Sequence, residues 1–464
     1  MSEAKVTLVK SAQTAEATGK LSFLEKVGFG AGDAACNMLF NPITMFLSFF
    51  YTDIFGLAPA VVATMFLVVR MFDAFFDPFY GSWMDNRRSK YGRYRKWMAV
   101  FTVPFAISCL IMFYTPDLSE TAKIAYAFAT YLLLSILYSC VNIPYCSLGG
   151  VITADPVDRV SCQKFRFIGA GLASLFCTFT LLPLVGYLGG GDRATGFFYT
   201  ISIFAVIAVF LFFFCFFYTR ERIQPREDEI GESFIVSFKK IIHNDQWLVS
   251  ISLMFLDCIP SFVRGAVSIY FAKYVLGFDD FAASVFLTLG ICANIVGAYL
   301  TSVFTNRWCK VTVYKAVKII CIVLSLLLFI IPSDQVVLIY AVFIILSVIH
   351  QIAAPIIWSF IGDVDDYGEW KLHQRASGLC ASGHLFTLKV ALAVGGALVG
   401  MVLSMTGYEA NLTEQSETAI HGIYALMTWI PAIGYLVTFL VTQFLYKLNR
   451  TMMARISKDI YATA

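Results

Sequence analysis

The segment Phe66–Asp85, FLVVRMFDAFFDPFYGSWMD, decides the fold of this chain. It is almost entirely apolar, it has the roughly 20 residues that a helix needs to cross a bilayer, and the basic sequence NRRSKYGRYRK follows it at once. Arg70, Asp73 and Asp77 lie within it at the spacing i, i+3, i+7. At about 100° per residue, these three charges share one stripe of a helix. The pattern predicts a membrane-spanning helix whose charged face is turned away from lipid.

The composition of the whole chain agrees with this interpretation. Of 464 residues, 59% are hydrophobic and only 14% are charged, with a mean hydropathy of +0.74, whereas about a quarter of the residues in soluble domains are charged. A soluble globular fold is therefore excluded. The 34 basic and 31 acidic residues give a net charge of +3 and no extended basic face, which argues against nucleic-acid binding. The 12 cysteines are scattered singly and are interpreted as small apolar side chains.

A window of about 19 residues divides the chain into twelve apolar segments. Their approximate bounds are 25–52, 58–84, 98–114, 123–149, 166–189, 196–218, 247–275, 281–304, 315–332, 336–360, 377–406 and 420–446. A long hydrophilic stretch separates the first six segments from the last six. An all-α integral membrane protein with two six-helix bundles around a central cavity is expected, as in secondary transporters. The expected parts are a tail (1–24), an N-terminal bundle (25–218), a central loop (219–246), a C-terminal bundle (247–446) and a second tail (447–464).

The distribution of basic residues predicts the orientation in the membrane. Lys and Arg gather in both tails and in the loops after the even-numbered segments, whereas the opposite loops hold only Lys123, Arg193 and Lys273. Because basic loops stay in the cytoplasm, we expect a multi-pass protein of the bacterial inner membrane with both termini cytoplasmic. Residues 1–20 are polar and contain no signal-peptide core.

Charges inside the apolar segments are the candidate functional groups, because a charge near the bilayer centre costs about 2.5–3.5 kcal/mol on insertion scales. Asp73 and Asp77 repel each other unless a positive group lies between them, so they are candidate ligands of a proton or of Na⁺, with Ser139 and Asn142 of the fourth segment. Arg70 is the candidate charge-balancing group. The alternative is an internal ion pair that only holds helices together.

A second polar stripe lies in the first segment, where Asp33, Asn37 and Asn41 repeat every four residues. Carboxylate and amide groups make several hydrogen bonds to sugar hydroxyls, so Asp33 and Asn37 are candidate substrate ligands. The alternative for Asp33 is an ion pair with a basic residue of a neighbouring segment.

Three further residues join the candidate substrate site. They are Asn142, Arg166 and Lys389. Lys389 lies too deep to reach the interface easily, whereas the alternative for Arg166 is an interfacial side chain that extends to the membrane surface. In the seventh segment, Asp257 and Arg264 are interpreted as a structural pair. His350 in the tenth segment is a weaker candidate for the cavity lining.

The loops supply candidate gating residues. Asp85 precedes a run of arginines that includes Arg93, and it could cap or pair with neighbouring helices and release them when the two halves rock. The stretch after the tenth segment carries four carboxylates, among them Asp363 and Asp366, which could pair with such basic loops. The alternative for the arginines is a simple orientation signal.

Six motifs in this order resemble one family along essentially the whole chain: the glycoside-pentoside-hexuronide:cation symporters of the major facilitator superfamily, which include the melibiose, glucuronide and xyloside carriers. The motifs are GFGAGD (28–33), FYTDIFGL (50–57), R-x-x-D-x-x-x-D-P (70–78), D-x-R-x-S-x-x-G-x-x-R (85–95), VNIPYCSLGGVIT (141–153), and DVDDYGEW (363–370) with the later LK (388–389).

The resemblance implies that Asp33 contacts the sugar, that Asp73 and Asp77 bind the coupling cation, and that Arg166 and Lys389 lie in the polar cavity. One departure is that Asn142 and Cys146 stand where the melibiose carrier has an acid and an aromatic residue. This puts galactosides and a strict Na⁺ site in doubt. The form VNIPYC is more similar to xyloside and glucuronide carriers, for which proton coupling is the usual inference.

The sequence therefore predicts a monomeric symporter that imports a glycoside, a pentoside such as a xyloside, with H⁺ or Na⁺. The alternatives are a carrier for a glucuronide or another hexoside, a carrier for lipid-like substrates, and a non-transporting membrane sensor. Neither a cofactor nor catalysis is expected, because nothing in the sequence resembles a nucleophile–base pair, a metal cluster or a phosphate loop.

Overall fold

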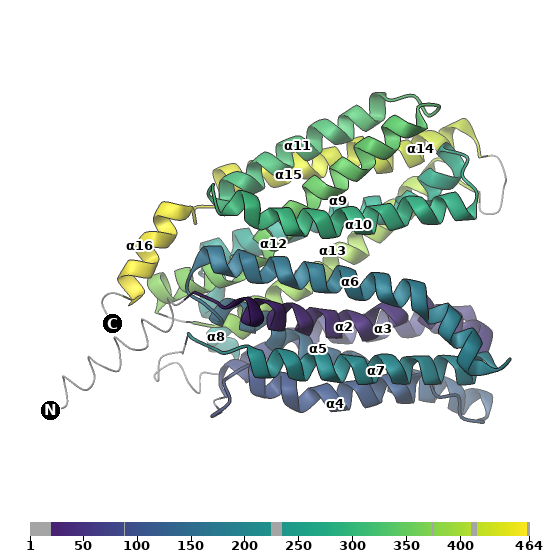
Figure 1. Cartoon of the computed structure of the whole chain (residues 1–464), viewed down its shortest axis with the longest axis horizontal. Helices are drawn as coiled ribbons and strands as arrows, with labels where there is room; N and C mark the ends of the chain where they lie inside the picture. The colour runs from purple at the N-terminus through teal and green to yellow at the C-terminus, as the bar shows by residue number, and fades with distance from the viewer. Residues whose placement is uncertain (1–19, 88, 224–233, 374, 410–414, 462–464) are drawn as a thin grey trace. The chain divides into compact units, whose positions relative to one another are not determined.

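The computed structural model describes residues 20–87, 89–223, 234–373, 375–409 and 415–461, and over these residues it is helical with short connections. The chain forms two compact units (Figure 1). Unit 1 comprises residues 1–241, 373–383 and 461–464, and unit 2 comprises residues 242–372 and 384–460. Each unit is a bundle of long helices.

Most of unit 1 comes from the first half of the chain. Its elements are α2 (Phe23–Phe49), η1 (Phe50–Ile54), α3 (Pro59–Asp85), α4 (Arg95–Met112), α5 (Glu120–Val151), α6 (Pro156–Gly189), α7 (Arg193–Tyr218) and most of α8 (Phe234–Ile242). Helix α2 packs against α6 and α7, and α4 packs against α5 and α7. Figure 1 shows α4 and α7 running side by side.

Side-chain caps fix where several of these helices begin. Ser22 and Glu25 form a reciprocal capping box at the start of α2, and the Asp155 side chain accepts a hydrogen bond from the second residue of α6. At α7, hydrogen bonds from the Thr195 hydroxyl and from the Thr195 and Ala194 backbone N–H groups hold the pKa of Asp192 below its usual value.

Glycines allow α2 and α6 to approach closely. A Cβ added to Gly30 would lie 2.5 Å from the Phe165 carbonyl oxygen, and one added to Gly169 would lie 2.5 Å from the Gly30 carbonyl oxygen. Since real Cβ atoms do not come so near, these positions need glycine. Small residues serve the same purpose in other membrane helix pairs.

Unit 2 is built from the second half of the chain. Its elements are α9 (Asp245–Tyr270), η3 (Phe271–Val275), α10 (Asp280–Thr305), α11 (Lys310–Ile330), α12 (Val336–Leu372), most of α13 (Ser377–Met405), α14 (Glu417–Met427), α15 (Trp429–Phe444) and α16 (Arg450–Tyr461). Its apolar core includes Val263, Phe271, Phe286, Leu328 and Leu426, each at most 1% exposed. Thr428 separates α14 from α15 with a non-helical backbone.

The outer surfaces of the helices suit a lipid environment. In the described part of the chain, ten helices are long and apolar enough to cross a membrane. Helices α2 and α3 are not among these ten, and each of them is 27 residues long. Large apolar side chains point outward, such as Phe75 at 70%, Phe210 at 72% and Val337 at 84% exposure. Because exposing so much apolar surface to water is unfavourable, we expect this surface to face lipid.

Several predicted boundaries differ from the structure. Helix α6 begins at Pro156, well before the predicted position 166, and α12 continues to Leu372 instead of ending near 360. The expected central loop (219–246) contains α8, and the expected C-terminal tail (447–464) contains α16. Of the expected N-terminal tail, residues 1–19 lie outside the described residues.

Candidate substrate and cation sites

The first polar group of unit 1 joins α2 to α6. The Arg166 Nε atom donates to Asp33 Oδ1 at 3.1 Å, and both side chains are buried. The Asn37 Nδ2 atom donates to the Asp33 backbone oxygen at 2.9 Å and lies 3.4 Å from its Oδ2. We call Asp33, Asn37 and Arg166 the α2–α6 group. Asn41, the third residue of the predicted stripe, donates to the Ser174 hydroxyl oxygen at 2.8 Å.

Arg166 is therefore a buried partner of Asp33, and the alternative of an interfacial side chain is wrong. The early start of α6 explains the error, because it places Arg166 nearly three turns inside the helix. The guanidinium lies 5.4 Å from the centre of the Tyr145 ring, whose hydroxyl donates to the Phe29 carbonyl at 2.7 Å. The ion pair is thus fixed in orientation by α5.

The candidate cation ligands meet between α3 and α5. Asp73 and Asp77 are 3% and 1% exposed, and the Ser139 hydroxyl donates to Asp77 Oδ1 at 2.6 Å. We call Asp73, Asp77 and Ser139 the α3–α5 group. Arg70, from the same helix as the two carboxylates, is half-buried and interacts electrostatically with the Tyr131 hydroxyl of α5.

Asn142 lies one turn after Ser139 on α5. Its Nδ2 atom donates to the Tyr138 hydroxyl at 3.3 Å, and its Oδ1 atom accepts from the Cys146 thiol at 3.7 Å. On the same helix, Ser139 donates to Asp77, and the Tyr145 ring lies 5.4 Å from the Arg166 guanidinium. This stretch of α5 therefore connects the two polar groups of unit 1.

Lys389, the remaining candidate for the substrate site, is half-buried on α13 in unit 2. In the same unit, His384 is fully buried and its Nε2 atom lies 2.8 Å from the Ser250 hydroxyl.

The candidate latch residue Asp85 holds the first turn of α13. Its Oδ1 and Oδ2 atoms accept hydrogen bonds at 2.9 Å from the backbone N–H groups of Gly378 and Leu379, at a segment that belongs to unit 1. The Tyr94 hydroxyl donates to Oδ1 at 2.7 Å, and the guanidinium of Arg93 lies 3.8 Å away. A carboxylate at a helix N-terminus satisfies free N–H groups and interacts favourably with the helix dipole.

Glu221 is a second carboxylate of this kind, and no sequence pattern predicted it. It accepts hydrogen bonds from the backbone N–H groups of Arg93, Tyr94 and Arg95, at 2.7, 2.8 and 2.8 Å, where α4 begins. Burial raises the pKa of Glu221, and these three N–H groups act in the opposite direction. The basic loop is thus attached to the end of α7.

The acidic stretch 363–370 belongs to α12, not to a loop, and Asp363, Asp365 and Asp366 are buried. The Lys310 Nζ atom lies 2.5 Å from Asp363 Oδ2 and donates to the Ser359 hydroxyl oxygen at 3.3 Å. The expected loop position is therefore wrong.

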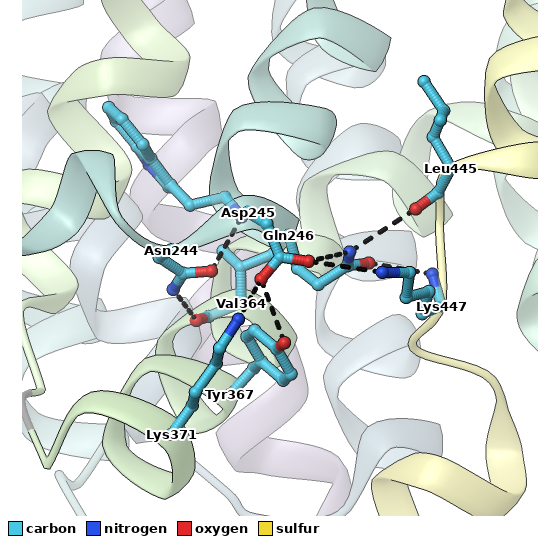
Figure 2. A network of polar contacts seen from close by, with 9 residues as sticks. Asn244, Asp245, Gln246, Val364, Tyr367, Lys371, Leu445 and Lys447 are labelled. Atoms are coloured by element: carbon cyan, nitrogen blue, oxygen red, sulfur yellow. Dashed lines mark hydrogen bonds and ion pairs between the residues drawn. The ribbon is translucent and has the colours of Figure 1, made fainter.

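A network at the start of α9 joins three helices of unit 2 (Figure 2). Asn244 caps α9 and donates to the Val364 carbonyl at 2.8 Å. Asp245 accepts from Lys371 at 2.6 Å and from the Tyr367 hydroxyl at 3.0 Å. On the other side, the Gln246 Oε1 atom accepts from the backbone N–H of Lys447 at 2.8 Å, after the end of α15.

A buried charged cluster lies within the spans of unit 2. It consists of Asp257 and Arg264 of α9, Lys318 of α11, His350 of α12 and Tyr435 of α15; we call it the unit-2 cluster. Asp257 pairs with Lys318, which is 0% exposed, and so the predicted pairing of Asp257 with Arg264 is wrong. Lys318 is the member that sequence reasoning missed, although a charge inside an apolar segment was the signal that could have found it.

The sequence and the structure of this chain are both similar to those of known transport proteins. Residues 28–450 match the family described as MFS/sugar transport protein. The inner membrane symporter YicJ of Escherichia coli (strain K12) is 38% identical over 444 residues, which cover 94% of this chain and 95% of that protein. The isoprimeverose transporter of Lactiplantibacillus pentosus is 33% identical over 92% of this chain and 89% of that protein. The outward conformation of the transporter FucP matches with a TM-score of 0.69 at 15% identity, covering 91% of this chain and 98% of that one.

The helical fold and the buried charges of its spans define a multi-pass membrane transport protein of the major facilitator superfamily, and not an enzyme. The chain belongs to the MFS/sugar transport protein family, that is, to the glycoside-pentoside-hexuronide:cation symporters. The family and the fold class predicted from the sequence are confirmed.

Proposed function

We propose that this glycoside:cation symporter imports a pentoside such as a xyloside, together with H⁺ or Na⁺, by alternating access. It works as a monomer in the bacterial inner membrane with both termini in the cytoplasm. The observation that carries the proposal is the pair of polar groups in unit 1, which lie on either side of one stretch of α5. The similarity to an isoprimeverose transporter supports a pentoside.

The sugar binds at the α2–α6 group, with Asn142 and Lys389. Arg166 holds the Asp33 carboxylate while Asn37 presents an amide beside it. Sugar hydroxyls donate to the carboxylate and accept from the guanidinium and the amide. The resemblance to the melibiose carrier implies an aromatic residue at position 146, where this chain has Cys146, so this position offers no ring to stack on a galactose.

The cation binds at the α3–α5 group, with Asn142 as a further oxygen ligand. Ser139 already donates to Asp77, so its hydroxyl oxygen and the carboxylate lie within reach of one small ion. Hard cations prefer such oxygen ligands, and a proton needs only the carboxylate. Because Ser139 of α5 contacts Asp77 and Tyr145 of the same helix lies against Arg166, a rearrangement at Asp77 on cation binding reaches the sugar site, and binding of the two ligands is coupled.

Gating uses the groups at the helix ends. Asp85 and Arg93 hold the start of α13, while Asp363 with Lys310, and Asp366, act within unit 2. Arg70 balances the carboxylates of α3. Release of these contacts accompanies the reorientation of the loaded carrier.

Transport in proteoliposomes tests this function. Counterflow with labelled xylosides, galactosides and glucuronides, with and without Na⁺ and a pH gradient, should show exchange of at least one xyloside. Asp73→Asn and Asp77→Asn should abolish gradient-driven accumulation, whereas Asp117→Asn, at an exposed carboxylate between α4 and α5, should not. Full uphill uptake by both span variants would remove these residues from coupling, and no exchange of any sugar would overturn the symporter function.

One observation favours the second candidate, a carrier for a glucuronide. The unit-2 cluster contains two permanently basic side chains, Arg264 and Lys318, and a single carboxylate, Asp257. An excess of positive charge inside a membrane protein suits an anionic substrate.

A further inference from the structure

A groove on the outer surface of unit 1 is separate from the candidate substrate and cation sites. It has a volume of about 580 Å³ and lies between the second half of α3 and the first half of α4. Aromatic side chains line most of it, and its polar end is at Asn86 and Arg87, where α3 ends. We call it the α3–α4 groove. Asp73 and Asp77 of α3 are buried and do not line it, so the groove is not part of the cation site.

The walls of the groove are preformed. The ring of Tyr80 stacks against those of Phe76 and Trp83, with centroid distances of 5.7 and 5.8 Å. The Tyr80 hydroxyl donates to the Cys140 carbonyl of α5 at 3.1 Å. Trp83 contacts Trp97 of α4 at a centroid distance of 4.7 Å. One aromatic surface therefore runs from α3 to α4, and Trp83, at 40% exposure, opens it to the outside.

Two cations lie on this aromatic surface at its polar end. The guanidinium carbon of Arg87 is 5.1 Å from the centre of the Trp83 ring, and the Lys96 Nζ atom is 4.6 Å from that of Trp97. Among the described residues, neither Arg87 nor Lys96 forms an ion pair. Because the two rings contact each other, the two positive charges belong to one surface.

Neighbouring basic residues of the same loop are engaged inside the protein. Arg93 is buried and lies 3.8 Å from Asp85, and Arg95 donates to the Phe216 carbonyl. Arg87, in contrast, is exposed. A signal for membrane orientation needs basic residues in the loop, but it does not need two of them on the rings of a groove. Their position therefore indicates a negatively charged ligand outside the protein.

We propose that the α3–α4 groove binds an anionic phospholipid of the surrounding membrane. An acyl chain lies along the rings of Tyr80 and Trp83, and the phosphate group pairs with Arg87 and Lys96. Trp and Tyr side chains prefer the level of the lipid headgroups, and an anionic leaflet attracts basic residues beside the membrane. A zwitterionic headgroup fits less well, because its own amine compensates the phosphate charge. The inference does not depend on which sugar is carried.

Native mass spectrometry of the delipidated full-length chain in detergent measures this preference. Phosphatidylglycerol and phosphatidylcholine with the same acyl chains are titrated separately, and the readout is the ratio of their dissociation constants for the first bound lipid. A basic side chain beside an anionic membrane surface contributes about 1 kcal/mol, which is about fivefold in affinity. For two such side chains we expect a preference of about 25-fold for phosphatidylglycerol.

Variants then test the residues. Arg87→Gln and Lys96→Gln should each lower the preference about fivefold, and the double variant should bring the ratio to about 1. Arg307→Gln is the matched control and should keep the ratio, because Arg307 is also an exposed basic residue next to an exposed tryptophan, Trp308, in the connection between α10 and α11. If Lys96→Gln does not fold, Arg87→Gln at an exposed position tests the site alone. Phe79→Ala removes an exposed ring of the groove and should weaken both lipids by a similar factor.

Several results would overturn the lipid site. A chain without preference for phosphatidylglycerol, or a preference that both Arg87→Gln and Lys96→Gln retain, would remove the two cations from lipid binding. An equal loss in Arg307→Gln would show a diffuse attraction to every basic loop, and unchanged binding of both lipids in Phe79→Ala would place the acyl chain elsewhere. Glycerol phosphate at the concentration of the lipid should not displace phosphatidylglycerol, because it has no acyl chain. Its displacement of the lipid would assign the groove to a soluble phosphate.

Discussion

The ion pair between Asp257 and Lys318 should couple strongly to the stability of unit 2. Lys318 is 0% exposed and the Asp257 side chain is 7% exposed, so removing one partner leaves the other charge buried. Such a loss costs about 3–5 kcal/mol, whereas replacing both partners by uncharged groups is often nearly neutral. We therefore expect Asp257→Asn and Lys318→Met each to destabilise the protein, and the double variant to recover most of the loss.

The size of the effect can be stated as a change in Tm. For a body of about 150–250 residues, each kcal/mol shifts Tm by roughly 2–4 °C, so each single variant should lower Tm by about 6–20 °C. A thiol-reactive dye suits the measurement, because nine of the 12 cysteines are buried and react only after unfolding. Lys371→Met, in the more exposed pair with Asp245, is the control and should cost less than about 1 kcal/mol. A double variant as unstable as the singles would refute the coupling.

Three other variants follow from contacts in unit 1, and the same dye assay checks them. Glu221→Ala removes the acceptor of three backbone N–H groups at the start of α4 and should cost about 2–4 kcal/mol, since each unsatisfied group costs about 1–3 kcal/mol and water recovers part of the loss; an unchanged Tm would show that the carboxylate does not hold the loop. Gly30→Val places a side chain against the Phe165 carbonyl, so it should lower Tm or prevent α2 from packing against α6. Gly186→Val, at a glycine with open space around it, should be tolerated. Asp85→Asn replaces a carboxylate that accepts from two backbone N–H groups with an amide that offers one acceptor oxygen; a loss of about 1–3 kcal/mol is expected, and equal Tm values would exclude the cap.

The sequence was sufficient to predict which polar residues share one face of a helix, but not which residues of other helices contact that face. Helical spacing places Asp33 and Asn37 on one face and Asp73 and Asp77 on another, and this needs only the 3.6-residue period. Spacing within one helix does not determine which other helix faces that stripe. The pairing of Asp33 with Arg166 across α2 and α6 is therefore a tertiary result.

Averaging over a window accounts for the boundary errors and for the missed lysine. The first turns of α6 include Asp158, Arg159 and Gln163, which lower the local hydropathy although all three are buried. The reverse applies to α11, where the high average hydropathy of the helix hides the buried charge of Lys318. A search for individual charges inside apolar segments would have found Lys318, but not Glu221, which lies in a connection and acts only through backbone N–H groups that come from another part of the chain.

The two units differ in the balance of charge among their buried candidate residues. In unit 1, the candidate residues are three carboxylates, Asp33, Asp73 and Asp77, against Arg70 and Arg166. In the unit-2 cluster, by contrast, the basic groups outnumber the acid. Because the bilayer interior disfavours net charge, a cation stabilises the first arrangement and an anionic group the second.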